Sequence, residues 1–276
     1  MANLKYILTQ ESIQFGGRTL YRITALKDFG DVKAGDLGGY IEKEFNISQE
    51  GNCWVRDNAV VLGNARVRNN VVVRDTAVVR DYAVVLGNSV VRDNALVRDY
   101  AVVGNYAVVS DNALVSGNAL VRDKCWIRGN AVIRDYAVVS DNAMVRDNAQ
   151  VSDTAVVRNY AVVRDNALVS DTAVVLDNAQ VRDYAVISDN AWVSDYAVVR
   201  ENAIATREVI TFRNIYTLTM TDNHIRYGCI QKKIEEWKLF LDSDEVIETK
   251  RDTDKFKAIE ITLRKAISMW ENNKDS

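Results

Sequence analysis

The stretch Val91-Arg-Asp-Asn-Ala-Leu96, followed at once by Val97-Arg-Asp-Tyr-Ala-Val102, is a sample of a six-residue repeat. The repeat runs without insertion through 25 hexads, from Val55 to Ile204. Position one of the hexad is Val or Ile in all 25 copies, and position five is Ala in 22. A fixed period over more than half of a 276-residue chain indicates a repeat architecture, in which each structural unit stacks on the next.

A period of six residues fits neither the 3.6-residue turn of an α-helix nor long β-strands. It does fit short strands that alternate with corners and coil into a solenoid. We expect position one to point inward from each strand, and the small residue at position five to point inward beside a corner. Positions three and four form the corners, where Asp, Asn and Gly tolerate unusual dihedral angles and bend a chain that has no proline.

This repeat resembles the hexapeptide repeat of left-handed parallel β-helix proteins, in which three hexads make one triangular coil. The resemblance implies a mainly β fold, a single-stranded left-handed parallel β-helix of about eight coils. At about 4.8 Å per coil, the prism would be about 40 Å long. The resemblance says little about function, because one fold can carry unrelated activities.

The segments on either side of the repeat are expected to cover the open strand edges at its two ends. Residues 1–54 form an N-terminal β cap with strands at Lys5–Thr9 and Thr19–Ile23, and with the glycine-rich Asp28–Gly39, which we interpret as a tight turn. After the solenoid (55–204), residues 205–276 predict an α+β module, a hairpin plus two helices. Its expected elements are strands at Val209–Phe212, Tyr216–Met220 and Ile225–Tyr227, and helices at Ile230–Leu241 and Thr253–Trp270.

Both flanks resemble segments of hexapeptide-repeat proteins from bacteria, phages and prophages, many of which carry the label transferase. The resemblance rests on Arg22–Gly39 and Asn46–Trp54 in the cap, and on Met220–Cys229 and Ile234–Trp237 in the module. It implies a protein of phage or prophage type, and it supplies no catalytic residue.

The composition argues against several functional classes. With 35 Lys and Arg against 38 Asp and Glu, the net charge of −3 gives no overall attraction to nucleic acid or to an anionic membrane. A single histidine is too few for a His-rich metal site, and we expect neither a metal nor a cofactor. Three cysteines without CxxC spacing, a polar N-terminus and the lack of a long apolar run indicate a cytoplasmic protein, in the host cytosol if a phage encodes it.

Enzymes with the left-handed β-helix fold are mostly acyltransferases, and the resemblance to them predicts a histidine base on a coil. The 150-residue repeat contains no histidine and no inserted loop, so we expect no catalytic residues. His224 and Cys229 could form a nucleophilic pair in the C-terminal module. The alternative is a hairpin histidine and a buried thiol. Cys125, in an Ala position, is interpreted as a core residue.

Outward side chains at position two suggest a binding surface. Every eighteenth residue stacks, which makes one column mostly of arginine: Arg56, Arg74, Arg92, Ser110, Arg128, Arg146, Arg164, Arg182 and Arg200. Either the Asp that follows most of these arginines neutralises them, or the column binds an anion such as a nucleotide phosphate, with corner tyrosines stacking on a base. The corner tyrosines could instead stack on one another. The candidate ligand-binding residues are Arg128, Arg146, Arg164, Arg182, Tyr136 and Tyr184.

Position six is apolar in 22 of 25 hexads, and includes Trp126, Met144 and Trp192. Such stripes suggest a covered surface, through a homotrimer or through the tail helices. The main hypothesis is a non-catalytic β-solenoid of phage type that acts by binding. It would be a host-interaction or counter-defence factor that captures an anionic small molecule, such as a nucleotide signal, or an acidic surface of a host protein. The alternatives are a structural or self-assembling virion or scaffold component, and an acyltransferase.

Overall fold

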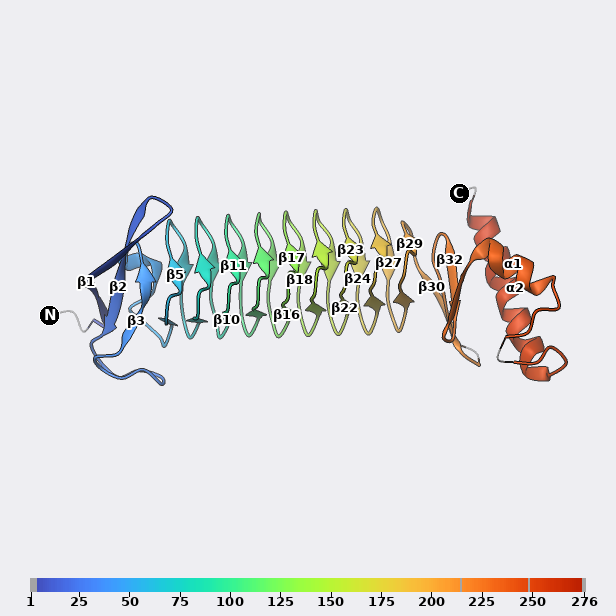
Figure 1. Cartoon of the computed structure of the whole chain (residues 1–276), viewed down its shortest axis with the longest axis horizontal. Coiled ribbons are helices and arrows are strands. Elements are labelled where there is room, and N and C mark those ends of the chain that lie inside the picture. Colours follow the sequence, from blue (N-terminus) through green and yellow to red (C-terminus); the bar gives the residue numbers. More distant parts are fainter. Residues whose placement is uncertain (1–3, 214, 248, 275–276) are drawn as a thin grey trace.

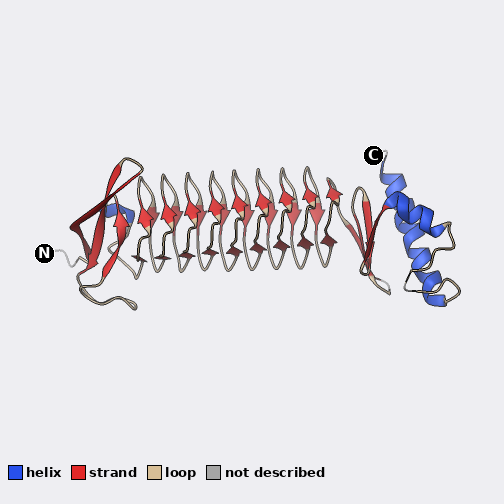
Figure 2. Ribbon diagram, in the orientation of Figure 1, coloured by secondary structure: helices blue, strands red, loops and turns tan. Residues whose placement is uncertain are grey.

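The computed structural model describes residues 4–213, 215–247 and 249–274, and it shows an elongated rod (Figures 1 and 2). A small sheet stands at the N-terminal end, a solenoid fills the middle, and a second sheet with two helices stands at the C-terminal end. This is the mainly β fold that the repeat predicts. The parallel solenoid has about nine turns rather than about eight, and one strand of the cap pairs in parallel with its first coil.

The solenoid is built from two-residue strands, one for each hexad. It starts with β4 (Trp54–Val55), and from β5 (Val60–Val61) to β29 (Ile204–Ala205) a new strand begins at position six of every hexad. Each strand pairs in parallel with the strand 18 residues later, as β11 (Leu96–Val97) does with β14 (Leu114–Val115). Three parallel sheets, one for each side of the prism, therefore enclose one core.

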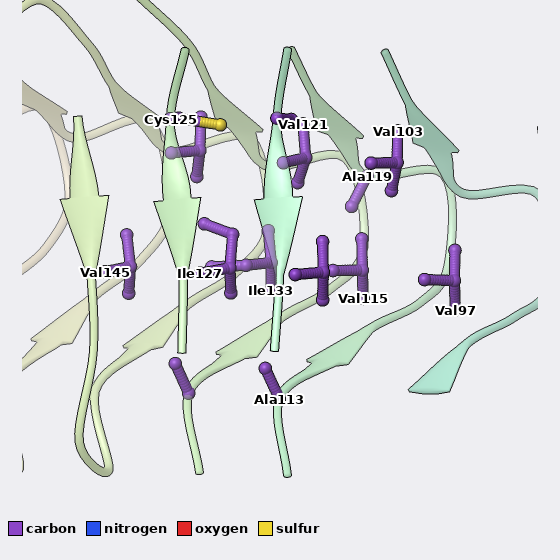
Figure 3. Packing of buried hydrophobic residues seen from close by; sticks show 14 of the residues in the cluster. Val97, Val103, Ala113, Val115, Ala119, Val121, Cys125, Ile127, Ile133 and Val145 are labelled. Carbon is purple, nitrogen blue, oxygen red and sulfur yellow. The ribbon is translucent and has the colours of Figure 1, made fainter. Parts of the chain in front are cut away.

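The core is a column of small and aliphatic side chains from positions one and five. All 25 residues at each of these positions are at most 1% exposed, which confirms the expected inward register. Figure 3 shows neighbouring rungs, with Val115, Ile133 and Ala119 among the buried side chains. Cys125 fills its Ala position as expected, and burial raises the pKa of its thiol to about 12, so this cysteine is an inert core residue.

Each corner is turned by a position-three residue in the left-handed conformation. All 25 have a positive φ, between 53° and 78°, and 21 of them are not glycine. Asp and Asn visit this region at lower cost than other residues, because their short side chains hydrogen-bond locally. Here the side chains also reach the next coil: Asp111 Oδ2 accepts a hydrogen bond from the Gly129 N–H at 2.8 Å. The predicted corner role of position three is confirmed.

Antiparallel strands close the N-terminal end of the solenoid. They are β1 (Tyr6–Phe15), β2 (Arg18–Ala25) and β3 (Leu37–Ile41), followed by the short 3-10 helix η1 (Glu44–Asn46). β3 pairs in parallel with β5, so the cap continues one solenoid sheet and covers its first edge. The glycine-rich stretch does turn at Gly30 and Gly35, but its last residues belong to β3, which corrects the interpretation as a turn. A Cβ on Gly39 would lie 2.5 Å from the Ala59 carbonyl oxygen, so close packing requires this glycine.

The C-terminal module is a four-stranded antiparallel sheet with two helices. Its elements are β30 (Ile210–Arg213), β31 (Thr217–Met220), β32 (His224–Tyr227), β33 (Ile230–Lys233), α1 (Ile234–Leu241) and α2 (Asp254–Lys274). The prediction of a helix from Ile230 is wrong for its first four residues. They form β33, which pairs with β32 across a turn at Gly228 (φ 62°). This pairing satisfies their backbone groups, an option that the local apolar pattern does not reveal.

The module closes the second end of the solenoid. The Asp222 N–H donates a hydrogen bond to the Ile204 carbonyl at 3.0 Å, and Asn223 Oδ1 accepts one from the Ile204 N–H at 2.9 Å. These bonds satisfy backbone groups that an open sheet edge leaves unpaired. Both helices lie beyond the module's sheet, on the side away from the solenoid (Figure 1), so they do not cover the prism sides. Neither helix, within the described residues, is long and apolar enough to cross a membrane.

Candidate functional site

The arginine column follows the nine-stranded solenoid sheet, which runs from β4 to β28 (Val198–Val199). Each member of the column is the residue directly after one of these strands. Because the strands pair in register, successive members lie about 4.8 Å apart along one edge of the prism. The repeat thus places the column, from Arg56 to Arg200, on a straight and rigid support.

Several of these arginines pair with the corner Asp that follows them. The nitrogen–oxygen distances are 3.4 Å for Arg74–Asp75, 3.0 Å for Arg92–Asp93, 2.7 Å for Arg146–Asp147 and 3.0 Å for Arg164–Asp165. At these rungs the structure confirms the local neutralisation that the sequence analysis set against anion binding. Arg146 and Arg164, two of the predicted ligand-binding residues, are therefore engaged, although each guanidinium has further N–H donors.

Arg128 and Arg182 differ from this pattern. Arg128 precedes Gly129 rather than an Asp and makes no ion pair within the described residues, and its Nη2 lies 3.8 Å from Met144 Sδ. Arg182 does precede an acid, Asp183, yet no ion pair joins the two within the described residues. The Nε of Arg182 is buried, with no hydrogen-bond partner in the described part of the chain. The predicted arginines are thus collinear but not equivalent.

The two predicted tyrosines lie on different edges of the prism. Tyr184 is on the edge of the arginine column, two residues after Arg182, whereas Tyr136 is on the next edge of the prism. Only Tyr184 can therefore stack beside the column. On the edge that carries Tyr136, Tyr82 and Tyr100 stack on each other, with ring centroids 4.9 Å apart, as the alternative interpretation expected.

An open hollow of about 410 Å³ lies beside this stacked pair. Its lining residues are Phe45, Asn64, Arg66, Tyr82, Val84 and Tyr100. Neither Phe45 nor Arg66 was predicted from the sequence as a site residue. Phe45 comes from η1, which is outside the repeat, so no repeat position identifies it. Arg66 does carry a signal in the sequence, because a polar residue is rare at position six.

The apolar residues at position six stay partly exposed along most of the solenoid. The cap buries the first of them, Val60, which is 3% exposed and packs with Leu20 and Tyr40. Farther along, Trp126 and Trp192 are 44% and 42% exposed. The described residues therefore do not cover the apolar stripes on which the expectation of a trimer rests.

His224 and Cys229 do not form a nucleophilic pair. His224 begins β32, and the strand alone separates its Cα from that of Tyr227 by about 10 Å, at about 3.3 Å per residue. Cys229 lies farther on, in the turn after Tyr227, and it is exposed rather than buried. Burial lowers the pKa of His224, and its Nδ1 has no hydrogen-bond partner among the described residues. Within the same residues, no group of three or more His, Cys, Asp and Glu side chains is placed to hold a metal.

The last rung of the column meets the C-terminal module. Arg200 Nη2 donates a hydrogen bond to the Cys229 carbonyl at 2.8 Å, and Gln231 Nε2 donates one to the Arg200 carbonyl at 2.9 Å. Arg226 in β32 lies close enough that burial and the charges of Arg200 and Arg182 lower its pKa. Arg226 was not predicted from the sequence as a site residue. Arg226 lies near the column only because the C-terminal module docks on the solenoid, and no local sequence pattern predicts that docking.

No family model matches the chain. Over 84 residues it is 38% identical to a protein of Escherichia coli (strain K12) named "Uncharacterized acetyltransferase YdcK". The match covers 27% of this chain and 26% of that protein, so the chain spans about a quarter of the relative's length. Together with the β-solenoid, this partial similarity fits a hexapeptide-repeat protein.

Proposed function

We propose that the protein binds an anionic ligand at one edge of its solenoid and does not act as a catalyst. The observation that carries the proposal is the straight column of guanidinium groups on a rigid support. Guanidinium groups hold phosphate and carboxylate oxygens with paired N–H donors. Because the coils fix the spacing of these groups, little conformational freedom is lost when a ligand binds.

The distribution of basic side chains supports binding over acyl transfer. Transfer to a hydroxyl or an amine uses a general base, most often histidine. The single histidine of the chain, His224, is outside the repeat and buried at the module junction. A host-derived nucleotide signal is the ligand that the resemblance to phage-associated proteins adds to this proposal.

A hexapeptide-repeat acyltransferase is the second candidate function, and the name of the Escherichia coli relative favours it. In that case acetyl-coenzyme A is a substrate, and the anionic groups of coenzyme A could use the same column. The two candidates differ in turnover. Binding alone leaves the thioester intact, whereas transfer releases the free thiol of coenzyme A.

Titration calorimetry with pyrophosphate, together with a thiol-release assay with acetyl-coenzyme A and a set of amine and hydroxyl acceptors, tests the proposal. We expect pyrophosphate to bind, with an affinity that falls steeply as salt is added, and thiol release to stay at the non-enzymatic rate. Thiol release above that rate would establish the second candidate. Pyrophosphate affinity that salt does not change would contradict the first.

A triple variant, Arg146→Ser, Arg164→Ser and Arg182→Ser, locates the binding edge. It should weaken pyrophosphate binding about tenfold or more, because each change removes charge-assisted hydrogen bonds. The fold should tolerate it, since Ser already occupies position two in seven hexads. The control variant, Arg122→Ser with Arg158→Ser on another edge, should weaken binding by less than about threefold. Unchanged affinity in the triple variant would turn the search to the apolar stripes and to protein partners.

A further inference from the structure

The last two arginines of the column, at its C-terminal end, differ in their contacts from the Asp-paired arginines before them. Arg164 pairs with the corner Asp that follows it. At the next rung, Arg182 has no such pair among the described residues, and Asp183 Oδ2 accepts the backbone N–H of Glu201 at 3.1 Å. At the last rung, Arg200 Nε lies 3.5 Å from Glu201 Oε1. Positive charge is therefore less compensated at Arg182 than at the Asp-paired rungs before it.

The C-terminal module adds a third arginine at this end. Arg226 in β32 lies opposite Gln231 of β33 in the strand register. The Gln231 side chain donates to the Arg200 carbonyl at 2.9 Å and to Glu201 Oε2 at 3.3 Å. These contacts fix the β32–β33 hairpin against the last rung. Burial and the charges of Arg200 and Arg182 lower the pKa of Arg226, which places all three guanidinium groups in one electrostatic neighbourhood.

Each of these three guanidinium groups has a buried Nε that makes no hydrogen bond within the described residues, although the Nε of Arg200 is in ion-pair range of Glu201. The Nε atoms of Arg182, Arg200 and Arg226 are buried, and none has a hydrogen-bond partner within the residues that the structure describes. Buried polar groups in folded proteins are nearly always paired. Glu201 is the one carboxylate in ion-pair contact with the three arginines in the described part of the chain. Arg182 and Arg226 therefore make no ion pair among these residues.

We propose that Arg182, Arg200 and Arg226 form a binding site for a phosphate group, carried by inorganic phosphate or by a small phosphate monoester. The assignment rests on the proposed anion-binding function and locates it at the junction of solenoid and module. A phosphate dianion carries a charge equal and opposite to that of the two arginines without an ion pair, and its oxygens can accept from Nε and Nη donors together. A carboxylate carries half that charge. A nucleic acid strand needs a continued positive track, which the Asp-paired rungs do not offer.

Titration calorimetry of the full chain with inorganic phosphate and with adenosine 5′-monophosphate tests this site. Arg182→Gln and Arg226→Gln should each weaken binding of both probes about tenfold or more, because each removes charge-assisted hydrogen bonds. Arg134→Gln is the matched control, because Arg134 occupies the same hexad position on another edge of the prism and pairs with Asp135 at 2.7 Å. It should weaken binding by less than about threefold.

The melting temperature separates a binding role of Arg226 from a structural one. In phosphate-free buffer, Arg226→Gln should melt no lower than the wild type, because it removes one of three like charges. Added phosphate should raise the melting temperature of the wild type and leave that of Arg226→Gln nearly unchanged. A lower melting temperature of Arg226→Gln without phosphate would assign Arg226 a structural role and overturn the proposal.

The outcomes distinguish the site from the broader function. If the wild type binds no anion, including pyrophosphate, the anion-binding function fails and this site fails with it. If the wild type binds but Arg226→Gln binds equally well, or Arg134→Gln is as impaired as Arg226→Gln, only this location is refuted. Given the expected losses in the variants, tighter binding of adenosine 5′-monophosphate than of phosphate identifies a phosphate monoester as the ligand. Equal affinity identifies phosphate itself, and either result supports the site.

Discussion

Replacement of Val115 by Ala should destabilise the solenoid by about 2–3 kcal/mol. Val115 is fully buried in β14, and it pairs with Val97 on one side and Ile133 on the other. The loss of two carbon atoms removes about 1.6 kcal/mol of transfer free energy, at about 0.8 kcal/mol each. The narrow prism cannot collapse around the gap. A residual cavity of up to about 50 Å³ therefore adds about 1 kcal/mol, at about 24 cal/mol per Å³.

The neighbouring Leu114 supplies a matched control. Leu114 occupies position six of the same strand and points outward, where it is only partly buried. Leu114→Ala removes one more carbon atom than Val115→Ala, yet at half burial it should cost only about 1 kcal/mol. Urea unfolding at unchanged m-value measures both changes in the free energy of unfolding. If Leu114→Ala costs as much as Val115→Ala, the inward and outward assignment of the hexad positions is refuted.

Three further predictions concern the corner, the column and the junction. Asp195 has a φ of 57°, a conformation that Val adopts only at a cost and Gly adopts freely. Asp195→Val should therefore lower the free energy of unfolding by about 1–2 kcal/mol, and Asp195→Gly should lower it by less. Equal urea midpoints for the two variants would contradict the role of position three at the corners. Loss of the exposed ion pairs in Arg146→Ser with Arg164→Ser should cost at most about 2 kcal/mol in the same assay, and a larger loss would make the column a structural feature. Burial holds the pKa of His224 below its ordinary value of 6.5, so the unfolded chain binds its proton first and stability should fall as the pH drops below 6.5. Between about pH 7.5 and about pH 5.5, the melting temperature of the wild type should therefore fall more than that of His224→Gln. Equal falls for the two proteins would refute the lowered pKa of His224.

The solenoid could be predicted almost completely because its signals are local and repeated. The apolar position one, the small position five and the Asp or Gly at position three each report one conformational demand, and 25 copies remove the ambiguity of any single hexad. The flanks have no such repetition. Residues Ile230–Lys233 fit a helix by their own pattern, and only pairing with β32 makes them a strand. Likewise, the need for glycine at Gly39 comes from the close approach of Ala59, which the sequence does not display.

The candidate site was predictable in part for the same reason. An 18-residue spacing stacks Arg146, Arg164 and Arg182 as soon as the coil has three hexads. Their inequivalence was not predictable, because Arg182 and Arg164 are both followed by Asp. Arg182 also lies near the end of the solenoid, where β32 brings in Arg226 from a separate sheet. A periodic sequence pattern does not predict side-chain contacts that form only when the C-terminal module docks on the solenoid.

Native mass spectrometry of the protein purified from its host tests the central claim most directly, because it reports the mass of the assembly and of any retained small molecule together. A binding protein of the proposed kind predicts a discrete assembly that carries up to one anionic small molecule for each chain, with phosphorus in its formula. The Arg182→Gln with Arg226→Gln variant should have the same assembly mass without the added molecule. Open-ended assemblies that carry no small molecule would contradict the account and establish a structural rod instead.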